Sequence, residues 1–143
     1  MTEMADWNTQ VIEEFRANKG ELSGQFAGAP VALLHHVGRK SGKQFLAPTM
    51  FLADESDPRA IYVFASKAGA PTNPEWYYNI TTAGTTSVEI GAETYQVTAE
   101  EVTGAERDRI YAEQAKRFPG FGEYAEKTEG IRTIPVLKLT RAN

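Results

Sequence analysis

Runs of β-branched and aromatic residues alternate with short polar turns along most of the chain. Such runs are typical of half-buried strands, and the Gly, Pro and Asp residues between them mark turns. Since most of the connections are short, successive strands are expected to pair as antiparallel hairpins. The predicted strands cover residues 31–37, 45–53, 61–65, 85–90, 93–102 and 131–140. Pro48 should place part of the second strand at an edge or a bulge.

Helical spacing appears first near the N-terminus. Trp7, Val11, Ile12 and Phe15 recur at the spacing of one helix face. This pattern predicts an amphipathic helix that stops near Lys19 and Gly20.

Two further helices are predicted from their start signals. Asn73 can accept a bond from a free N–H, and Pro74 loses nothing at a first helical position. That helix should carry the aromatic residues 76–78 and end by Gly84. The residues Thr103 and Glu106 match a capping box, so a helix should run from there to Phe118. An aromatic segment, residues 118–124, follows and is broken by Pro and Gly.

Six strands joined mostly by hairpins, with three or four helices, predict an α+β domain. Sequential antiparallel strands tend to close into a small barrel. A length of 143 residues suits a single domain. We expect an N-terminal amphipathic helix over residues 1–20 and a barrel domain over residues 21–143. The chain lacks a βαβ unit with a Gly-x-Gly-x-x-Gly loop, which argues against a Rossmann site.

Composition narrows the function classes. The chain has no cysteine, which excludes disulfides, Cys-based zinc sites and thiol nucleophiles. A net charge of -4 argues against a nucleic-acid partner. The N-terminus is acidic without an apolar run, and no stretch is apolar enough to span a membrane. We therefore expect a cytoplasmic protein.

The segment Gly38–Lys43, GRKSGK, is a basic island in an acidic chain. It carries three cations and a hydroxyl between two glycines, and no acid occurs from residue 31 to residue 51. These groups suit a phosphate or a carboxylate, by charge and by a nest of converging backbone N–H groups. A solvated hairpin tip explains the same residues equally well.

A second candidate site follows the strand 61–65, where Ser66 and Lys67 precede a helix start. A lysine beside free helix N–H groups can hold something flat and electron-rich, or anionic. An ordinary strand-to-helix connection is the alternative. His35 and His36 point to opposite faces of their strand, so no metal site is expected.

Five motifs occur in order along the chain: GRKSG (38–42), Pro48, ASKAG (65–69), NPEWY (73–77) and IPV (134–136). Together they resemble the deazaflavin-dependent nitroreductase family of actinobacteria, and the resemblance runs from about Phe26 to the C-terminus. It implies a split β-barrel of the FMN-binding type flanked by short helices. It also implies a hydride-transferring oxidoreductase that uses coenzyme F-420, a deazaflavin with a phosphate and an oligoglutamate tail.

The resemblance also implies a role for each motif. The phosphate and the start of the tail would lie against Arg39, Lys40, Ser41 and Gly42, with Lys43 close by. The ring would lie along Pro48, Thr49 and Met50. Polar contacts to the ring edge and the tail would come from Ala65, Ser66, Lys67 and Ala68. The groove would be closed by Asn73, Trp76 and Tyr77.

The chain departs from the family pattern on both the coenzyme side and the acceptor side. Many members carry Arg where this chain has Phe45, so phosphate binding would depend more on the other cations of the hairpin. The prodrug-reducing member has tyrosines at the positions of Phe118, Phe121 and Met50. By resemblance, Phe118, Phe121 and Tyr124 would contact the substrate, and Tyr124 or water would supply the proton.

Three functions remain open from the sequence. The first is reduction of a quinone or nitroaromatic by the reduced deazaflavin, with possible peripheral membrane contact through a quinone substrate. The second is an FMN-dependent reductase with the same barrel, and the third is a non-catalytic carrier of the coenzyme. The protein would be a monomer or a homodimer.

Overall fold

The computed structural model describes residues 3–23 and 28–142, with side chains of the first helix from Thr9 onward. The helices are α1 (Glu3–Ala17), α2 (Glu75–Ala83), α3 (Gly104–Arg117) and α4 (Gly120–Thr128), with a short 3-10 turn, η2 (Lys67–Gly69). The strands are β1 (Val31–Val37), β2 (Gln44–Ala53), β3 (Ala60–Phe64), β4 (Thr85–Ile90), β5 (Glu93–Val102) and β6 (Val136–Arg141). All six predicted strands are present, although β6 begins at residue 136 rather than 131.

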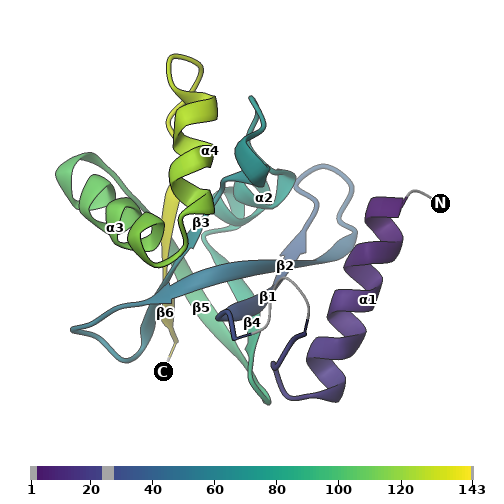
Figure 1. The fold of residues 1–143 in the computed structure, drawn as a ribbon. Helices are drawn as coiled ribbons and strands as arrows, with labels where there is room; N and C mark the ends of the chain where they lie inside the picture. Colours follow the sequence, from purple (N-terminus) through teal and green to yellow (C-terminus); the bar gives the residue numbers. More distant parts are fainter. Residues whose placement is uncertain (1–2, 24–27, 143) are drawn as a thin grey trace.

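The six strands close into an antiparallel barrel in the order β1-β2-β3-β6-β5-β4 (Figure 1). The long strand β2 pairs with β1 over residues 44–50 and with β3 over residues 51–53. Pro48 lies opposite Leu33, in the part of β2 that is paired with β1 alone. This confirms its expected edge position, because a proline is tolerated where a strand is paired on one side.

Apolar side chains from all six strands fill the barrel interior. One cluster joins Leu34, Val63, Val88 and Leu137, all fully buried, with Trp76 and Ile80 of α2. Because α2 contributes to this interior cluster, it acts as a plug at one end of the barrel.

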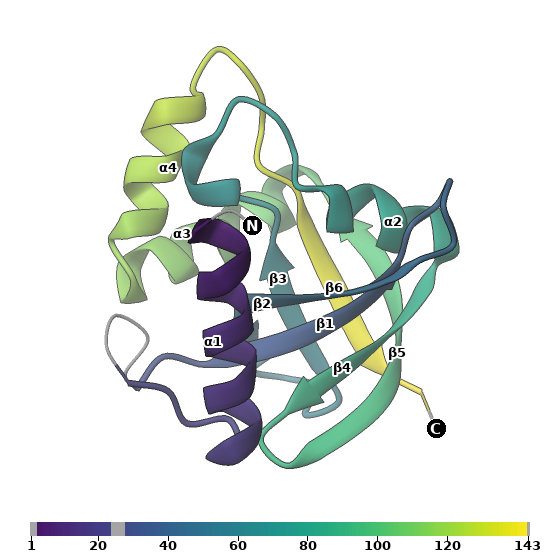
Figure 2. The ribbon, with the colours of Figure 1, turned by 90° about the vertical axis from the view of Figure 1, so that its right-hand side faces the viewer.

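Helices cover two separate areas of the outer surface. On one side Phe15 of α1 packs against Val31 and Leu33, and on the other side α3 and α4 pack over β3 and β6. Figure 1 shows α1 and α3 on opposite sides of the barrel, and Figure 2 shows α1 running across β1 and β2. The α1 helix ends as predicted, since Gly20 has a φ of +93° and its N–H donates to Phe15 O at 2.8 Å. The side chain of Trp7 and the loop residues 24–27 lie outside the described residues.

Two predicted helix caps differ from the structure. The N-cap residue of α2 is Pro74 and not Asn73. The side-chain oxygen of Asn73 does not cap the helix, since it accepts a hydrogen bond from Arg132 at 2.8 Å. Thr103 does take the N-cap position of α3, but its side chain makes no capping hydrogen bond. Both helices start where the pattern indicated, and both cap hydrogen bonds were predicted wrongly.

The described helices include none that combines the length and the apolar character needed to cross a bilayer.

Candidate functional site

The hairpin between β1 and β2 uses its own backbone N–H groups. Gly38 donates to Lys43 O at 2.8 Å, and Gly42 donates to Gly38 O at 2.9 Å. The N–H of Arg39 donates to the side-chain oxygen of Asn79 at 3.1 Å. Three N–H groups of the hairpin are therefore already paired, which leaves fewer donors for the predicted nest. An anion at this hairpin would depend on the basic side chains.

Arg39 is the anchored cation of the hairpin. Its Nη1 donates to Asn79 Oδ1 at 2.9 Å and to Glu75 Oε2 at 2.8 Å. The guanidinium also lies over the ring of Tyr78, 5.0 Å from the centroid, a favourable cation–π position. The hydrogen bond from Arg39 lowers the pKa of the Glu75 carboxyl. Since Glu75 is largely exposed, an anionic ligand could replace this carboxylate beside a guanidinium that is already held in place.

His36 fixes the orientation of Asn79. Because Asn79 Oδ1 accepts from Arg39, its Nδ2 faces His36 Nδ1 at 2.9 Å and donates to it. His36 is therefore neutral with the proton on Nε2, and burial lowers the pKa of its imidazole. Phe45 stacks on the same imidazole, with ring centroids 5.3 Å apart. His35 points to the other face, where its Nε2 lies 2.7 Å from Glu89, so the predicted opposite orientation of the two histidines is confirmed.

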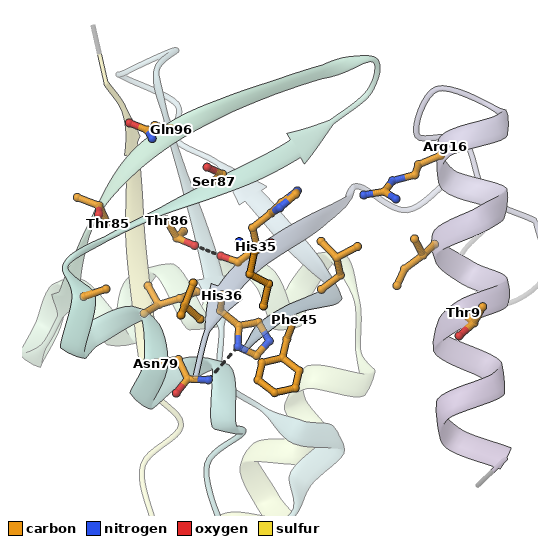
Figure 3. A pocket seen from close by; sticks show the side chains of 16 residues that line it. Thr9, Arg16, His35, His36, Phe45, Asn79, Thr85, Thr86, Ser87 and Gln96 are labelled. Carbon is orange, nitrogen blue, oxygen red and sulfur yellow. Dashed lines mark hydrogen bonds between the residues drawn. The ribbon is translucent and has the colours of Figure 1, made fainter. Parts of the chain in front are cut away.

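Two adjoining cavities flank this network and share His36, Phe45 and Asn79 in their walls. The smaller, of about 390 Å³, also includes Arg39 and Lys40. The larger, of about 800 Å³, lies between α1 and the barrel and is drawn in Figure 3. The basic side chains that line the larger cavity away from the network, Arg16 and His35, both contact Glu89. Glu75 lines the smaller cavity and pairs with Arg39, but its side chain is 73% exposed, whereas that of Glu89 is 12% exposed. The smaller cavity is therefore the better place for an anion.

The loop after β3 has an unusual backbone. Three consecutive residues, Lys67, Ala68 and Gly69, have φ values of +48°, +53° and +82°. Ser66 is half-buried and Lys67 is exposed, and Lys67 Nζ donates to Thr72 Oγ1 at 3.2 Å. Two non-glycine residues in this conformation cost free energy, and such strain is often found at functional sites.

Two of the expected ring contacts, Ala65 and Thr49, face the barrel interior instead. Ala65 is fully buried in the interior cluster, so it can offer a ligand only its backbone. Side chains alternate along a strand, and Pro48 and Met50 share the outer face of β2 while Thr49 faces the other side. The outer face of β2 is therefore the surface on which a flat ring could lie.

The helix α2 turns its large aromatic residues in different directions. Trp76 is buried in the interior cluster, and Tyr77 packs against the same cluster. Burial and a hydrogen bond to Glu101 raise the pKa of Tyr77 to about 12. These positions favour a role in the core over the expected groove closure. Tyr78, which the resemblance did not single out, is the aromatic residue that contacts Arg39.

The aromatic segment 118–124 ends α3 and forms the first turn of α4. Phe121 is buried against Phe64 and Tyr111, whose ring centroids lie 5.6 and 6.4 Å away. Phe118 and Tyr124 are half-buried and border the same cluster as Met50. Gly69 packs close to Tyr124, because a Cβ on Gly69 would lie 3.4 Å from Tyr124 Cα. The structure thus brings the loop after β3 against the aromatic segment.

A continuous line of contacts joins the two halves of the site. Arg39 lies over Tyr78, the hydroxyl of Tyr78 accepts from Asn73 Nδ2 at 3.2 Å, and Asn73 Oδ1 accepts from Arg132 at 2.8 Å. Arg132 then donates to Ser66 O at 2.9 Å. The basic hairpin and the left-handed loop are thus connected through the start of α2.

Sequence reasoning missed four residues of this line and its surroundings: Glu75, Tyr78, Asn79 and Arg132. Each acts on a partner far away in the chain, and the interaction of Arg132 with Ser66 spans 66 residues. The single available signal was local, because Tyr78 and Asn79 directly follow the NPEWY motif.

Comparisons with known proteins identify the family of this chain. The family described as F420H(2)-dependent quinone reductase matches residues 7–141. The Mycobacterium tuberculosis protein Rv3178, provisionally named as such a reductase, is 34% identical over 110 residues, which cover 77% of this chain and 88% of the relative.

Solved structures give the same result. A structure described as an F420-H2 dependent reductase, FDR-A, matches with a TM-score of 0.65 and 34% identity over 77% of this chain and 93% of the other. A second, described as a domain-swapped dimer, matches with a TM-score of 0.67 and 29% identity over 96% and 99% of the two chains. The resemblance drawn from the five motifs is thereby confirmed, and the chain belongs to the F420H(2)-dependent quinone reductase family.

Proposed function

We propose that this chain reduces a quinone-type acceptor with the reduced form of coenzyme F-420. The observation that carries the proposal is the line of contacts from Arg39 to Ser66, which joins an anion site to a strained polar loop. A ligand with both a phosphate and a polar flat ring suits such a line. The family membership of the chain supports the choice of the deazaflavin.

The residues present fit this coenzyme. Arg39 and Lys40 line the smaller cavity and offer charge to the phosphate, with Lys43 close by for the start of the tail. Ser41 and Gly42 shape the turn between them, and Gly42 takes a φ of +73°. At the other end of the line, the half-buried Ser66 and the exposed Lys67 and Ala68 suit the polar edge of the ring.

The acceptor would lie near the aromatic segment. Pro48 and Met50 provide an apolar strand face, and Phe118 and Tyr124 border it from α3 and α4. When bound, the reduced coenzyme supplies the hydride. The chain positions the two rings, and Tyr124, or water beside it, supplies a proton to the reduced acceptor. Reduction of a quinone to its hydroquinone by one hydride then needs one proton.

The proposal is tested by following oxidation of the reduced coenzyme by absorbance. The acceptors are menadione-type quinones, nitroaromatics and enones, and FMN is titrated separately. We expect coenzyme F-420 to bind and to be oxidised fastest by quinones. Tight binding without oxidation by any acceptor would instead indicate a carrier, and binding of FMN alone would indicate a flavin reductase.

A further inference from the structure

The loop between β3 and α2, residues 65–73, holds a conformation that its own sequence does not favour. Lys67 and Ala68 both have positive φ values, and neither is a glycine. The left-handed conformation is disfavoured by the Cβ of an L-residue, more so for two in succession. Contacts from outside the loop must therefore maintain it.

Arg132 provides the polar part of those contacts, beside the packing of Gly69 against α4. Its Nε donates to Ala70 O at 2.9 Å, and its Nη2 donates to Ser66 O at 2.9 Å. Its Nη1 donates to Ala65 O at 3.2 Å and to Asn73 Oδ1 at 2.8 Å. One guanidinium therefore joins both ends of the loop, on either side of the left-handed residues.

The partners of Arg132 are unusual for an arginine. All four acceptors are neutral oxygens of one short segment, and none of the ion pairs found among the described residues includes Arg132. Burial lowers the pKa of its guanidinium. A fork with five donors in fixed geometry suits the spread of carbonyl groups around a turn, and a lysine could not reproduce it.

A second arginine also contacts the segment before β6. Arg107 of α3 donates from Nε and Nη2 to Ile134 O, at 3.1 and 2.9 Å, and lies over the ring of Tyr111. These contacts attach the segment before β6 to α3. They include no residue of the loop 65–73, so Arg107 offers a matched control.

We propose that Arg132 is a positioning residue of the coenzyme site. It holds the loop 65–73 in the left-handed form that presents Ser66, Lys67 and Ala68 toward the coenzyme, and it holds Asn73 against Tyr78 at the end of the Arg39 contacts. This inference rests on the proposed function for the identity of the ligand. The hydrogen bonds from Arg132 to the loop do not depend on that function.

The test compares Arg132→Met, Arg132→Lys and Arg107→Met with the unaltered chain. Three quantities are measured: the melting temperature, the dissociation constant of purified coenzyme F-420 by fluorescence titration, and hydrogen exchange of the ligand-free protein. The most informative amides are those of Gly69 and Ala70, which donate to Ser66 O and Lys67 O at 2.9 and 3.0 Å.

We expect Arg132→Met to raise the dissociation constant at least tenfold and to speed exchange at Gly69 and Ala70. Arg132→Lys keeps the charge without the fork, and it should recover only part of the affinity. Arg107→Met should lower the melting temperature comparably, with a dissociation constant within twofold of the original. If Arg132→Met does not fold, Arg132→Lys alone decides, since full affinity in that variant would overturn the proposal.

Two outcomes separate this inference from the proposed function. If the unaltered chain binds no coenzyme F-420, the proposed function fails, and unchanged exchange at Gly69 and Ala70 in the Arg132 variants would then overturn the positioning role as well. If the coenzyme binds and Arg132→Met affects affinity no more than Arg107→Met does, the proposed function stands and Arg132 is structural only.

Discussion

The side-chain oxygen of Asn79 accepts two hydrogen bonds from Arg39, one from the guanidinium at 2.9 Å and one from the backbone N–H at 3.1 Å. The amide nitrogen of Asn79 then faces the buried His36. Two elements far apart in the chain, the hairpin and α2, are thereby fixed to each other. The guanidinium is held before any ligand arrives, which reduces the ordering cost of binding.

The first prediction concerns Arg39. Arg39→Ala should weaken binding of coenzyme F-420 by roughly 1.5–3 kcal/mol, the range of hydrogen bonds to charged groups. Binding to the unaltered chain should also weaken with salt. Isothermal calorimetry measures both effects, and Arg117→Ala is the control, because Arg117 pairs with Glu113 away from this cavity. Equal affinities of Arg39→Ala and the control would identify the hairpin as a solvated tip.

The second prediction concerns the counterion of the same guanidinium. We expect a bound anion to replace the Glu75 carboxylate at Arg39. Glu75→Gln should therefore strengthen coenzyme binding by roughly two- to fivefold, the scale of an exposed ion pair. The same calorimetric titration checks this. A weaker affinity in Glu75→Gln would mean that Glu75 helps to hold Arg39 in its binding position.

The third prediction concerns pH. Burial lowers the pKa of His36 in the folded chain, so below the ordinary histidine pKa of about 6.5 the unfolded chain binds more protons than the folded one. The free energy of unfolding should therefore be greatest above that value and should fall as the pH drops toward the folded pKa. Urea unfolding at several pH values between 5 and 8 measures this.

The matched variant for this prediction is His36→Gln, which should remove the decrease between pH 6.5 and 5. Carboxylates whose pKa is lowered, such as Glu14 and Glu89, lose their stabilising effect mainly at a pH near or below their ordinary pKa of 4.5. An identical pH dependence in His36→Gln and the unaltered chain would show that His36 is not the group responsible.

The fourth prediction separates binding from strain at Lys67. Lys67→Ala should raise the dissociation constant of the coenzyme several-fold with little change in melting temperature, because its hydrogen bond to Thr72 is exposed. Lys67→Gly should weaken binding in the same way but raise the free energy of unfolding by about 1 kcal/mol relative to Lys67→Ala, since glycine tolerates a positive φ. A large loss of melting temperature in Lys67→Ala with normal affinity would mark the lysine as structural.

The fifth prediction concerns the acceptor. Phe118 cannot donate a hydrogen bond to a nitro oxygen, and a nitro group against apolar rings loses hydration at a cost of about 1–3 kcal/mol. We expect good reduction of menadione-type quinones and poor reduction of nitroimidazoles. Phe118→Tyr should raise nitro turnover relative to quinone turnover by roughly two- to tenfold, the scale of one hydrogen bond.

The double variant tests the structural position of Phe121. Because Phe121 is buried, Phe121→Tyr would place its hydroxyl in an apolar cluster. Adding it to Phe118→Tyr should lower the free energy of unfolding by about 1–3 kcal/mol. If the unaltered chain already reduces nitroimidazoles as fast as quinones, the hydroxyl argument fails, and the shape of the site would decide specificity.

The sequence predicted what is encoded locally. The alternation of residues 85–90 and 93–102 defined both strands of one hairpin to the residue, and the five ordered motifs indicated the family. The hydrogen-bond partners could not be predicted in the same way. The N–H of Arg39 donates to Asn79, which lies 40 residues away in the chain. Arg132 donates to the side chain of Asn73, which was expected to cap α2. Such pairings depend on how the barrel closes, which leaves no periodic signal in the chain.

The plugged interior of the barrel bears on how such a protein can change over time. The interior cluster is closed by α2 and shares no residue with the aromatic segment 118–124, which we propose faces the acceptor. Exchanges at Phe118 or Tyr124, which border the outer cluster, therefore leave this interior packing untouched. A lineage built on this scaffold could adopt new electron acceptors one surface position at a time, without first acquiring compensating substitutions in its core.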